Sequence, residues 1–453
     1  MITFQSVLRT GALVFLVAVV VRPTSTHANP ASLVPSAAEP GHPVDLHLRL
    51  DYEYQLDRAL LTREAVGEPV DPLAPLPRHP DLQFHQYRHV LTPRADVGVY
   101  HDTWLSFALP LVIAQARELE LADGVTRDGS STLRDGLLPV GGFDARDPGT
   151  PPPGNLVFRG IGRKGLDQLH IGLNTAPMNQ RRDDTKPTWK LGAELRLAVG
   201  KVMRFDVMKP GEETGLGKGV HELRLWTSFD RRYAHAEAWM ELFWQVPIAA
   251  RSGSLFKDPG FGATNTSLSQ TAGTNFGVEA FALDDKINGN RITLDLGARI
   301  VGHFEGRDYS EMWEVFALAG DSRGSGPLVL DANPINPEFQ GLSHPGISNI
   351  ESYLETAAHF AMRAELGPHV RFAAVVDVVW KTDHVISFAD AGVDLPTCGP
   401  GVGTCEADAN ELVNPGTAEV NPLHAPRIDL VGHRYHSEDN LGLVIGVLGQ
   451  YVF

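Results

Sequence analysis

Hydrophobic and polar residues alternate with a period of two along most of this chain, most clearly in its last segment, 441–453 (LGLVIGVLGQYVF). Side chains at alternate positions of a β-strand point to opposite faces of the sheet. Tyr451 and Phe453 are two residues apart, so both aromatic side chains are expected on one face. Segment 44–54 alternates more strongly, because leucines and tyrosines alternate with Asp, His, Arg and Glu. The pattern predicts strands rather than helices.

The same alternation predicts five hairpins between the first and last strands. Their arms cover 84–100 and 105–121, 168–179 and 188–199, 222–230 and 235–246, 274–283 and 291–305, and 351–366 and 371–386. Short polar turns join the arms of each hairpin, whereas longer loops separate the hairpins. The chain is therefore predicted to be all-β, with about twelve antiparallel strands. A short helix is expected in the loop 306–348, where Met312, Val315, Phe316 and Ala319 recur at helical spacing.

The N-terminus has the pattern of a secretory signal peptide. Arg9 precedes an apolar core from Ala12 to Val21, and Thr26-His27-Ala28 offers a cleavage site after Ala28. The apolar core is too short to span a bilayer as a helix, which needs about 20 residues. We therefore predict a cleaved signal peptide at 1–28, a flexible Pro- and Ala-rich leader at 29–43, and one domain at 44–453.

Net charge and cysteine usage narrow the function classes. The formal net charge is −16 and no basic run is present, so binding to nucleic acid is not expected. Cys398 and Cys405 lie in a Gly- and Pro-rich segment, CGPGVGTC, and export favours a local disulfide between them. A two-cysteine metal site is disfavoured because no further ligands stand at matching spacing. Neither a metal nor a cofactor is expected.

The two faces of the predicted strands differ consistently in chemistry, one being apolar and the other ionisable. A secreted β-sandwich also alternates polar and apolar positions. Three features favour a membrane protein: the export signal, the regular order of short turns and long loops, and the terminal Phe453. We predict a transmembrane antiparallel up-and-down β-barrel with short periplasmic turns and long extracellular loops.

The whole mature region resembles bacterial outer-membrane β-barrel proteins of the monomeric, roughly twelve-stranded kind. Its layout is also similar, more distantly, to transporter-like outer-membrane proteins linked to the degradation of aromatic compounds. The resemblance implies the outer membrane of a Gram-negative cell and contact with its lipid. It also implies recognition of Tyr451 and Phe453 by the barrel-assembly machinery, and often passive uptake of small solutes.

The ionisable face is the predicted lining of the lumen and the expected working surface. The predicted lining residues are Arg49, Asp51, Glu53, Glu194, Arg196, Glu222, Arg224, Trp226, Glu237, Trp239, Glu241, Asp295, Arg299, Glu355, Arg363, Asp377 and Lys381. Two interpretations remain open: a pore that selects solutes by charge, or an ion-pair network that fills a closed interior. Trp226 and Trp239 likewise either form an aromatic path for a solute or pack inside the barrel.

Catalysis is not expected. Some twelve-stranded outer-membrane barrels are lipid hydrolases that place a His and a Ser two residues apart on one face, whereas His436 and Ser437 are adjacent here. His433 lies about 13 Å from Ser437 along a regular strand, too far for a hydrogen bond. His85 and His89 are similarly too far apart to share a metal ion. We expect a monomeric channel or transporter for a small solute, the alternatives being a closed barrel that acts through its loops and, less favoured, a hydrolase.

Overall fold

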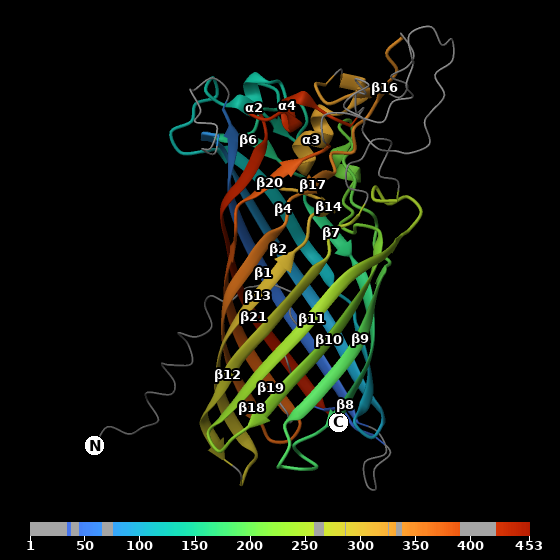
Figure 1. The fold of residues 1–453 in the computed structure, drawn as a ribbon, viewed down its shortest axis with the longest axis vertical. Helices are drawn as coiled ribbons and strands as arrows, with labels where there is room; N and C mark the ends of the chain where they lie inside the picture. Colours follow the sequence, from blue (N-terminus) through green and yellow to red (C-terminus); the bar gives the residue numbers. More distant parts are fainter. Residues whose placement is uncertain are drawn as a thin grey trace, which may run out of the picture.

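The computed structural model describes residues 34–37, 45–65, 76–257, 267–285, 287–324, 326–331, 338–389 and 423–453. The wall strands form one antiparallel sheet that closes on itself (Figure 1). β1 (Leu46–Glu64) pairs with β2 (Arg78–Tyr100) on one side and with the last strand, β21 (Tyr435–Val452), on the other. Closure removes the open strand edges that hydrocarbon does not tolerate.

Within the described ranges, twelve antiparallel strands make up the wall, as the sequence predicts. The third wall strand is interrupted at Leu109 and Pro110 into β3 (Thr103–Ala108) and β4 (Leu111–Leu121), since proline has no amide hydrogen for the ladder. The remaining wall strands are β8 (Gln168–Met178), β9 (Thr188–Ala198), β10 (Val220–Arg232), β11 (Ala236–Ala250), β12 (Thr271–Asp285), β13 (Asn290–His303), β18 (Tyr353–Leu366) and β19 (Val370–Lys381).

β1 extends about ten residues beyond the predicted end at Tyr54. In this extension both faces are partly apolar, because Ala59 and Leu61 are buried in the interior while Leu60 lies on the opposite face. The alternation of polar and apolar residues that revealed the lower part of the strand is therefore lost.

The wall strands expose their apolar side chains and bury their charged ones, the opposite of a soluble protein, and β11 shows this most clearly. Met240, Leu242 and Trp244 are 38%, 43% and 47% exposed. The intervening Glu241 is 1% exposed and Trp239 6%. A soluble sheet buries its apolar face and exposes its charges. The apolar face here points away from the barrel, as a lipid-facing wall requires.

One end of the barrel is covered by a folded cap, seen at the top of Figure 1. The cap contains α2 (Ser131–Arg134), α3 (Trp313–Ala319) and α4 (Pro426–Asp429), and α3 occupies the predicted helical segment. Its apolar core joins helix residues such as Leu133 and Phe316 to the upper ends of β1, β2 and β21. The short strands at this end are β5 (Phe143–Asp144), β6 (Leu156–Arg159), β7 (Arg163–Leu166), β14 (Gly306–Asp308), β15 (Leu330–Asp331), β16 (Gly341–Leu342), β17 (Ser348–Ile350) and β20 (His384–Ser387), with 3-10 turns at Pro210–Glu212 and Ser322–Gly324.

The opposite end carries the short turns and the C-terminus (Figure 1). Here residues 34–37, part of the predicted leader, pack against the barrel. Val34 is 3% exposed and joins Trp104, Ala176 and Trp226 in one apolar cluster, and Ala37 forms a β-bridge with His101. We name residues 34–37 the N-terminal stopper. The predicted signal peptide, the rest of the leader, and Cys398 and Cys405 lie outside the described residues.

Candidate functional site

A cavity of 340 Å³ lies inside the barrel beside the strands from β1 to β11, and we name it the lower chamber. Fourteen of its sixteen lining residues are polar or ionisable, the exceptions being Ala108 and Pro110. The ionisable members are Arg49, Asp51, Glu53, Arg88, Arg94, Asp167, His170, Glu194, Arg196, Lys218 and Glu222. Six of the predicted lining residues therefore meet in this one cavity: Arg49, Asp51, Glu53, Glu194, Arg196 and Glu222.

Short ion pairs fix most charges of the lower chamber against the wall. Arg49 contacts Asp51 at 2.6 Å and Arg196 donates to Glu194 at 2.8 Å, each pair within one strand. Lys218 donates to Asp308 at 2.6 Å, which ties the chamber to β14. Same-face neighbours two residues apart along a strand are close enough for such pairs. The charged side chains of the chamber are consequently held in place on the wall.

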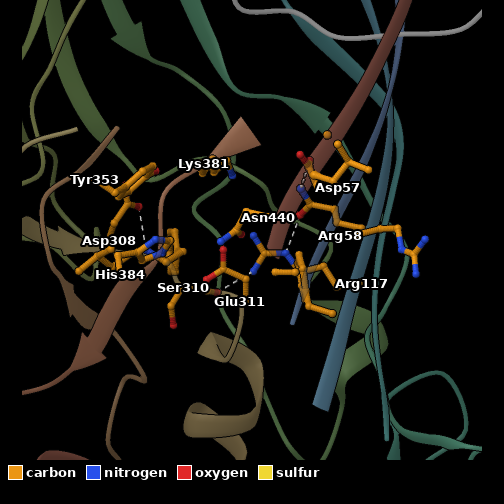
Figure 2. A pocket seen from close by; sticks show the side chains of 17 residues that line it. Asp57, Arg58, Arg117, Asp308, Ser310, Glu311, Tyr353, Lys381, His384 and Asn440 are labelled. Carbon is orange, nitrogen blue, oxygen red and sulfur yellow. Dashed lines mark hydrogen bonds between the residues drawn. The ribbon is translucent and has the colours of Figure 1, made fainter. Parts of the chain in front are cut away.

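A second cavity of 140 Å³, the upper chamber, lies between the lower chamber and the cap. Figure 2 shows Asp57 and Arg117 on one side of it, Lys381 and His384 on the other, and Glu311 between them. Arg117 donates to Gln86 at 2.8 Å. Of the predicted lining residues, Lys381 belongs to this cavity.

Successive inward positions of β1 show how the interior is layered. Asp51 and Glu53 line the lower chamber, Asp57 lines the upper chamber, and Leu61 lies in the apolar core of the cap. The chambers are thus stacked along the barrel beneath the cap.

The wall from β11 to β19 is packed with charge instead of hollowed. Arg363 contacts Asp295 at 2.7 Å and Glu279 at 2.9 Å. Asp377 contacts His359 at 2.5 Å. Further pairs join Arg224 to Glu241 at 2.8 Å and Arg299 to Glu355 at 2.6 Å. Glu237 is also buried on this side. These predicted lining residues brace the interior, whereas the β1–β10 side leaves a cavity.

The inward tryptophans lie against glycines of neighbouring strands. A Cβ at Gly277 would approach Trp239 Cζ2 to 2.8 Å, and one at Gly297 would approach it to 3.1 Å. The Trp239 indole N–H donates to Asp295 at 2.9 Å. A Cβ at Gly192 would similarly lie 2.6 Å from Trp226 Nε1. Both rings are packed against the wall, which favours the packing interpretation over a free aromatic path.

The cap is held to the interior by a buried arginine. Arg163, 2% exposed, contacts the Glu314 carboxylate of α3. Its Nη1 donates to the carbonyls of Glu213 and Gly215 at 2.8 and 2.9 Å, and its guanidinium lies 5.2 Å from the Trp313 ring centroid. This one side chain joins α3 to the loop that precedes β10. We name it the cap clamp.

Two carboxyl groups at the capped end of the barrel have shifted pKa values. Burial alone would raise the pKa of Glu64, but hydrogen bonds with His436, Arg434 and the Gly432 amide lower it to about 2. Burial raises the pKa of Asp429 in α4 to about 6. The Glu64 cluster joins the upper ends of β1 and β21, so it fastens the seam where the barrel closes.

His436 and Ser437 lie in the upper part of β21, and their side chains contact different partners. His436 Nε2 lies 3.0 Å from Glu64 Oε1, whereas Ser437 is fully buried and donates to Asn440 at 3.0 Å. Adjacent residues of a strand point to opposite faces, so this pair is not arranged for catalysis. Within the described ranges, no three His, Cys, Asp or Glu side chains group closely enough to hold a metal ion. No described helix is long and apolar enough to cross a membrane.

Sequence reasoning missed several residues of the site. Arg88 and Arg94 lie on the same inward face of β2, so the period-two pattern could have identified them. Asp167 and Lys218 flank strands, so alternation gave no signal for them. The contacts of Val34 and the cap clamp join segments far apart in the chain, and no local pattern reveals them.

Aromatic side chains mark the outer surface of the wall. Trp244 and Trp380 are 47% and 46% exposed, and Tyr451 and Phe453 are 43% and 61% exposed near the C-terminus. Such residues form the interfacial girdles of membrane barrels. The Phe453 amide also donates to the Leu46 carbonyl at 2.9 Å, so the last residue is fastened to the first strand.

No protein-family model matches the sequence, and the curated proteins contain no match. Among solved structures, an outer membrane channel from Pseudomonas putida F1 is 9% identical, with a TM-score of 0.34 over 95% of this chain and 98% of that chain. A FadL homologue from Pseudomonas aeruginosa is 8% identical, with a TM-score of 0.31 over 96% and 99%. The outer membrane protease OmpT from Escherichia coli is 6% identical, with a TM-score of 0.26 over 90% and 97%. These values identify no activity.

The architecture itself is decisive. The sheet is closed, its outer surface is apolar with exposed aromatic residues, and its interior holds buried charges. Only a bilayer makes an apolar outer wall of this kind stable. The chain is therefore a β-barrel of the bacterial outer membrane.

Proposed function

We propose that the protein is a gated channel that carries small polar solutes across the outer membrane. The observation that carries this proposal is the lower chamber, a hydrophilic cavity enclosed by the wall between the N-terminal stopper and the cap. Its volume of 340 Å³ lies within the range of small-molecule sites, about 300–1,000 Å³.

The lining of the lower chamber suits a solute that remains hydrated. Most of its charges are already paired along the wall, so a passing molecule meets fixed donors and acceptors without breaking the barrel. The inward rings of Trp226 and Trp239 are packed against glycines elsewhere, so the chamber offers an apolar solute no tryptophan surface. Small polar molecules are the class that this surface favours.

Both closures are separable from the wall. The N-terminal stopper contacts the barrel through Val34 and Ala37, and the cap is joined by its apolar core and the cap clamp. Segments that are not part of the sheet can move while the wall stays intact. We therefore expect a channel that is closed at rest and opens when both segments are displaced.

A closed barrel that acts through its loops is the second candidate. The charge network on the β11–β19 side favours it, because this network fills the interior as a structural brace would. Displacing the N-terminal stopper and the cap distinguishes the gated channel from the closed barrel. A channel then admits solutes, whereas a braced, solid interior does not.

Solute entry into proteoliposomes, followed by osmotic swelling, tests the proposal. Three proteins are compared: the intact chain, Val34→Asn with Arg163→Met, and Val34→Ile as a matched control. The Val34→Asn substitution would place an amide in an apolar cluster, at a cost of about 1–3 kcal/mol, and so displace the stopper. Heat-dependent electrophoretic mobility verifies that each barrel is folded.

We expect fast swelling with small neutral sugars for the doubly substituted protein and slow swelling for the intact chain and the control. A folded double variant that admits no solute refutes the channel proposal and supports the closed barrel.

A further inference from the structure

The charge balance of the lower chamber is acidic. Five cations line it, namely Arg49, Arg88, Arg94, Arg196 and Lys218, together with five carboxyl groups. Two of these cations are already paired with carboxylates outside the lining, Arg94 with Asp96 at 3.0 Å and Lys218 with Asp308 at 2.6 Å. The other three cations pair with carboxylates of the lining, Arg49 with Asp51, Arg88 with Asp167 and Arg196 with Glu194. Among the described residues this leaves Glu53 and Glu222 as the lining carboxyl groups without an ion pair.

Glu222 is the member of this set that is best placed to meet a solute. Its Oε2 accepts hydrogen bonds from Gln168 Nε2 at 3.0 Å and from Gln245 Nε2 at 2.9 Å. The two amide groups thereby fix the orientation of this carboxylate at the chamber wall. Within the described ranges no cation lies at ion-pair distance from Glu222, so its charge is oriented by amides and is not neutralised by contact.

Glu53 is a second carboxyl group of the lining with no ion pair in the described part of the chain. The acidic balance does not depend on it, because Glu222 remains without an ion pair when Glu53 is left out. Charged side chains that line a narrow passage select ions of opposite sign.

We infer that the lower chamber selects small cations, and that organic amines are the solute class it fits. This inference rests on the proposed channel function and adds the sign of the charge that passes. An ammonium group would donate to Glu222 at the wall, while the amide groups of Gln168 and Gln245 beside it and the Thr92 hydroxyl elsewhere in the lining hold the rest of a polar solute. A carboxylate-bearing solute would instead meet the surplus acid.

Reversal potentials in a potassium chloride gradient test the inference in planar bilayers. The stopper- and cap-loosened protein, Val34→Asn with Arg163→Met, serves as the common background. Glu222→Gln is compared with Glu212→Gln, an identical substitution on an exposed loop residue whose side chain is 69% exposed. The amide oxygen introduced by Glu222→Gln can still accept from the two neighbouring glutamines, so the wall is expected to remain folded.

The background protein should pass K⁺ in preference to Cl⁻. Glu222→Gln should lower the K⁺/Cl⁻ permeability ratio by about fivefold, the effect of one carboxylate at about 4 Å in water-like surroundings. Glu212→Gln should leave the ratio unchanged. Ethylammonium chloride should give a cation preference that falls in the same way.

The outcomes separate the two proposals. Conductance with a preference for Cl⁻, or a cation preference that Glu222→Gln does not reduce, overturns the inference while the channel function stands. A folded background protein without conductance refutes the channel function itself, and the inference with it.

Discussion

The cap clamp offers the sharpest test of how the capped end of the barrel is closed. Arg163 and Glu314 are 2% and 4% exposed, so each would be a buried, uncompensated charge without the other. Removing one partner of such a pair costs about 3–5 kcal/mol. In Arg163→Met this cost should fall on the cap, because α3 contributes Glu314 while the wall is held by its own ladder of hydrogen bonds.

Amide hydrogen exchange measures the effect. The stated cost corresponds to exchange that is faster by about two to four powers of ten for amides of α3, with wall amides unchanged. Replacing both partners, Arg163→Met with Glu314→Met, should restore much of the protection, because no unpaired charge is left. Recovery should be incomplete, since Arg163 also donates to the carbonyls of Glu213 and Gly215.

Arg323→Met is the matched control. Arg323 is 53% exposed and pairs with Asp206 and Asp321, and solvent-exposed ion pairs contribute little to stability. Exchange at α3 that changes by less than a factor of about three in Arg163→Met would refute the clamp. A double variant no better protected than the single variant would show that the buried charge is not the cause.

The wall and its seam give three further predictions. Gly277→Ala should destabilise the barrel by about 1–3 kcal/mol, because the added Cβ would meet Trp239 and the Leu296 carbonyl. Urea unfolding followed by tryptophan fluorescence measures this change. Gly302→Ala, whose Cβ would have its nearest neighbour 3.8 Å away, should be nearly neutral, and equal effects of the two substitutions would contradict the packing argument. Glu64 has a pKa lowered from 4.5 to about 2, so its contribution to stability is present above pH 4.5 and is lost as the pH falls towards 2. Glu64→Gln should therefore flatten the pH dependence of the unfolding free energy between pH 4.5 and 2. An unchanged pH profile would count against a stabilising role for the Glu64 cluster. Phe453→Ala should reduce the amount of folded barrel in the outer membrane, measured by heat-dependent mobility, while Phe339→Ala, an exposed loop phenylalanine, should not.

The wall was predictable because its signal is local. Each strand repeats its polar and apolar positions every two residues, and the structure bears out twelve strands with arms close to the predicted bounds. The short helix at 313–319 was also visible in the spacing of Met312, Val315, Phe316 and Ala319. Where both faces are partly apolar, as in the upper part of β1, the signal disappears.

The interior was only partly predictable, because a strand pattern shows which face a residue occupies and not what fills the space opposite. Glu194 and Glu241 have similar sequence surroundings, yet one lines a cavity and the other is packed against Arg224. The role of Trp239 depended on Gly277 and Gly297, which lie on other strands. Val34 reaches Trp226 only because the barrel folds around it.

Single-channel recording in planar bilayers tests the central claim most directly, namely that a polar lumen is closed at rest by the N-terminal stopper and the cap. The intact protein should be silent apart from rare openings, whereas Val34→Asn with Arg163→Met should show reproducible, sustained conductance steps. Sustained conductance from the intact protein would contradict closure at rest. A folded double variant that stays silent would contradict the existence of a continuous polar path.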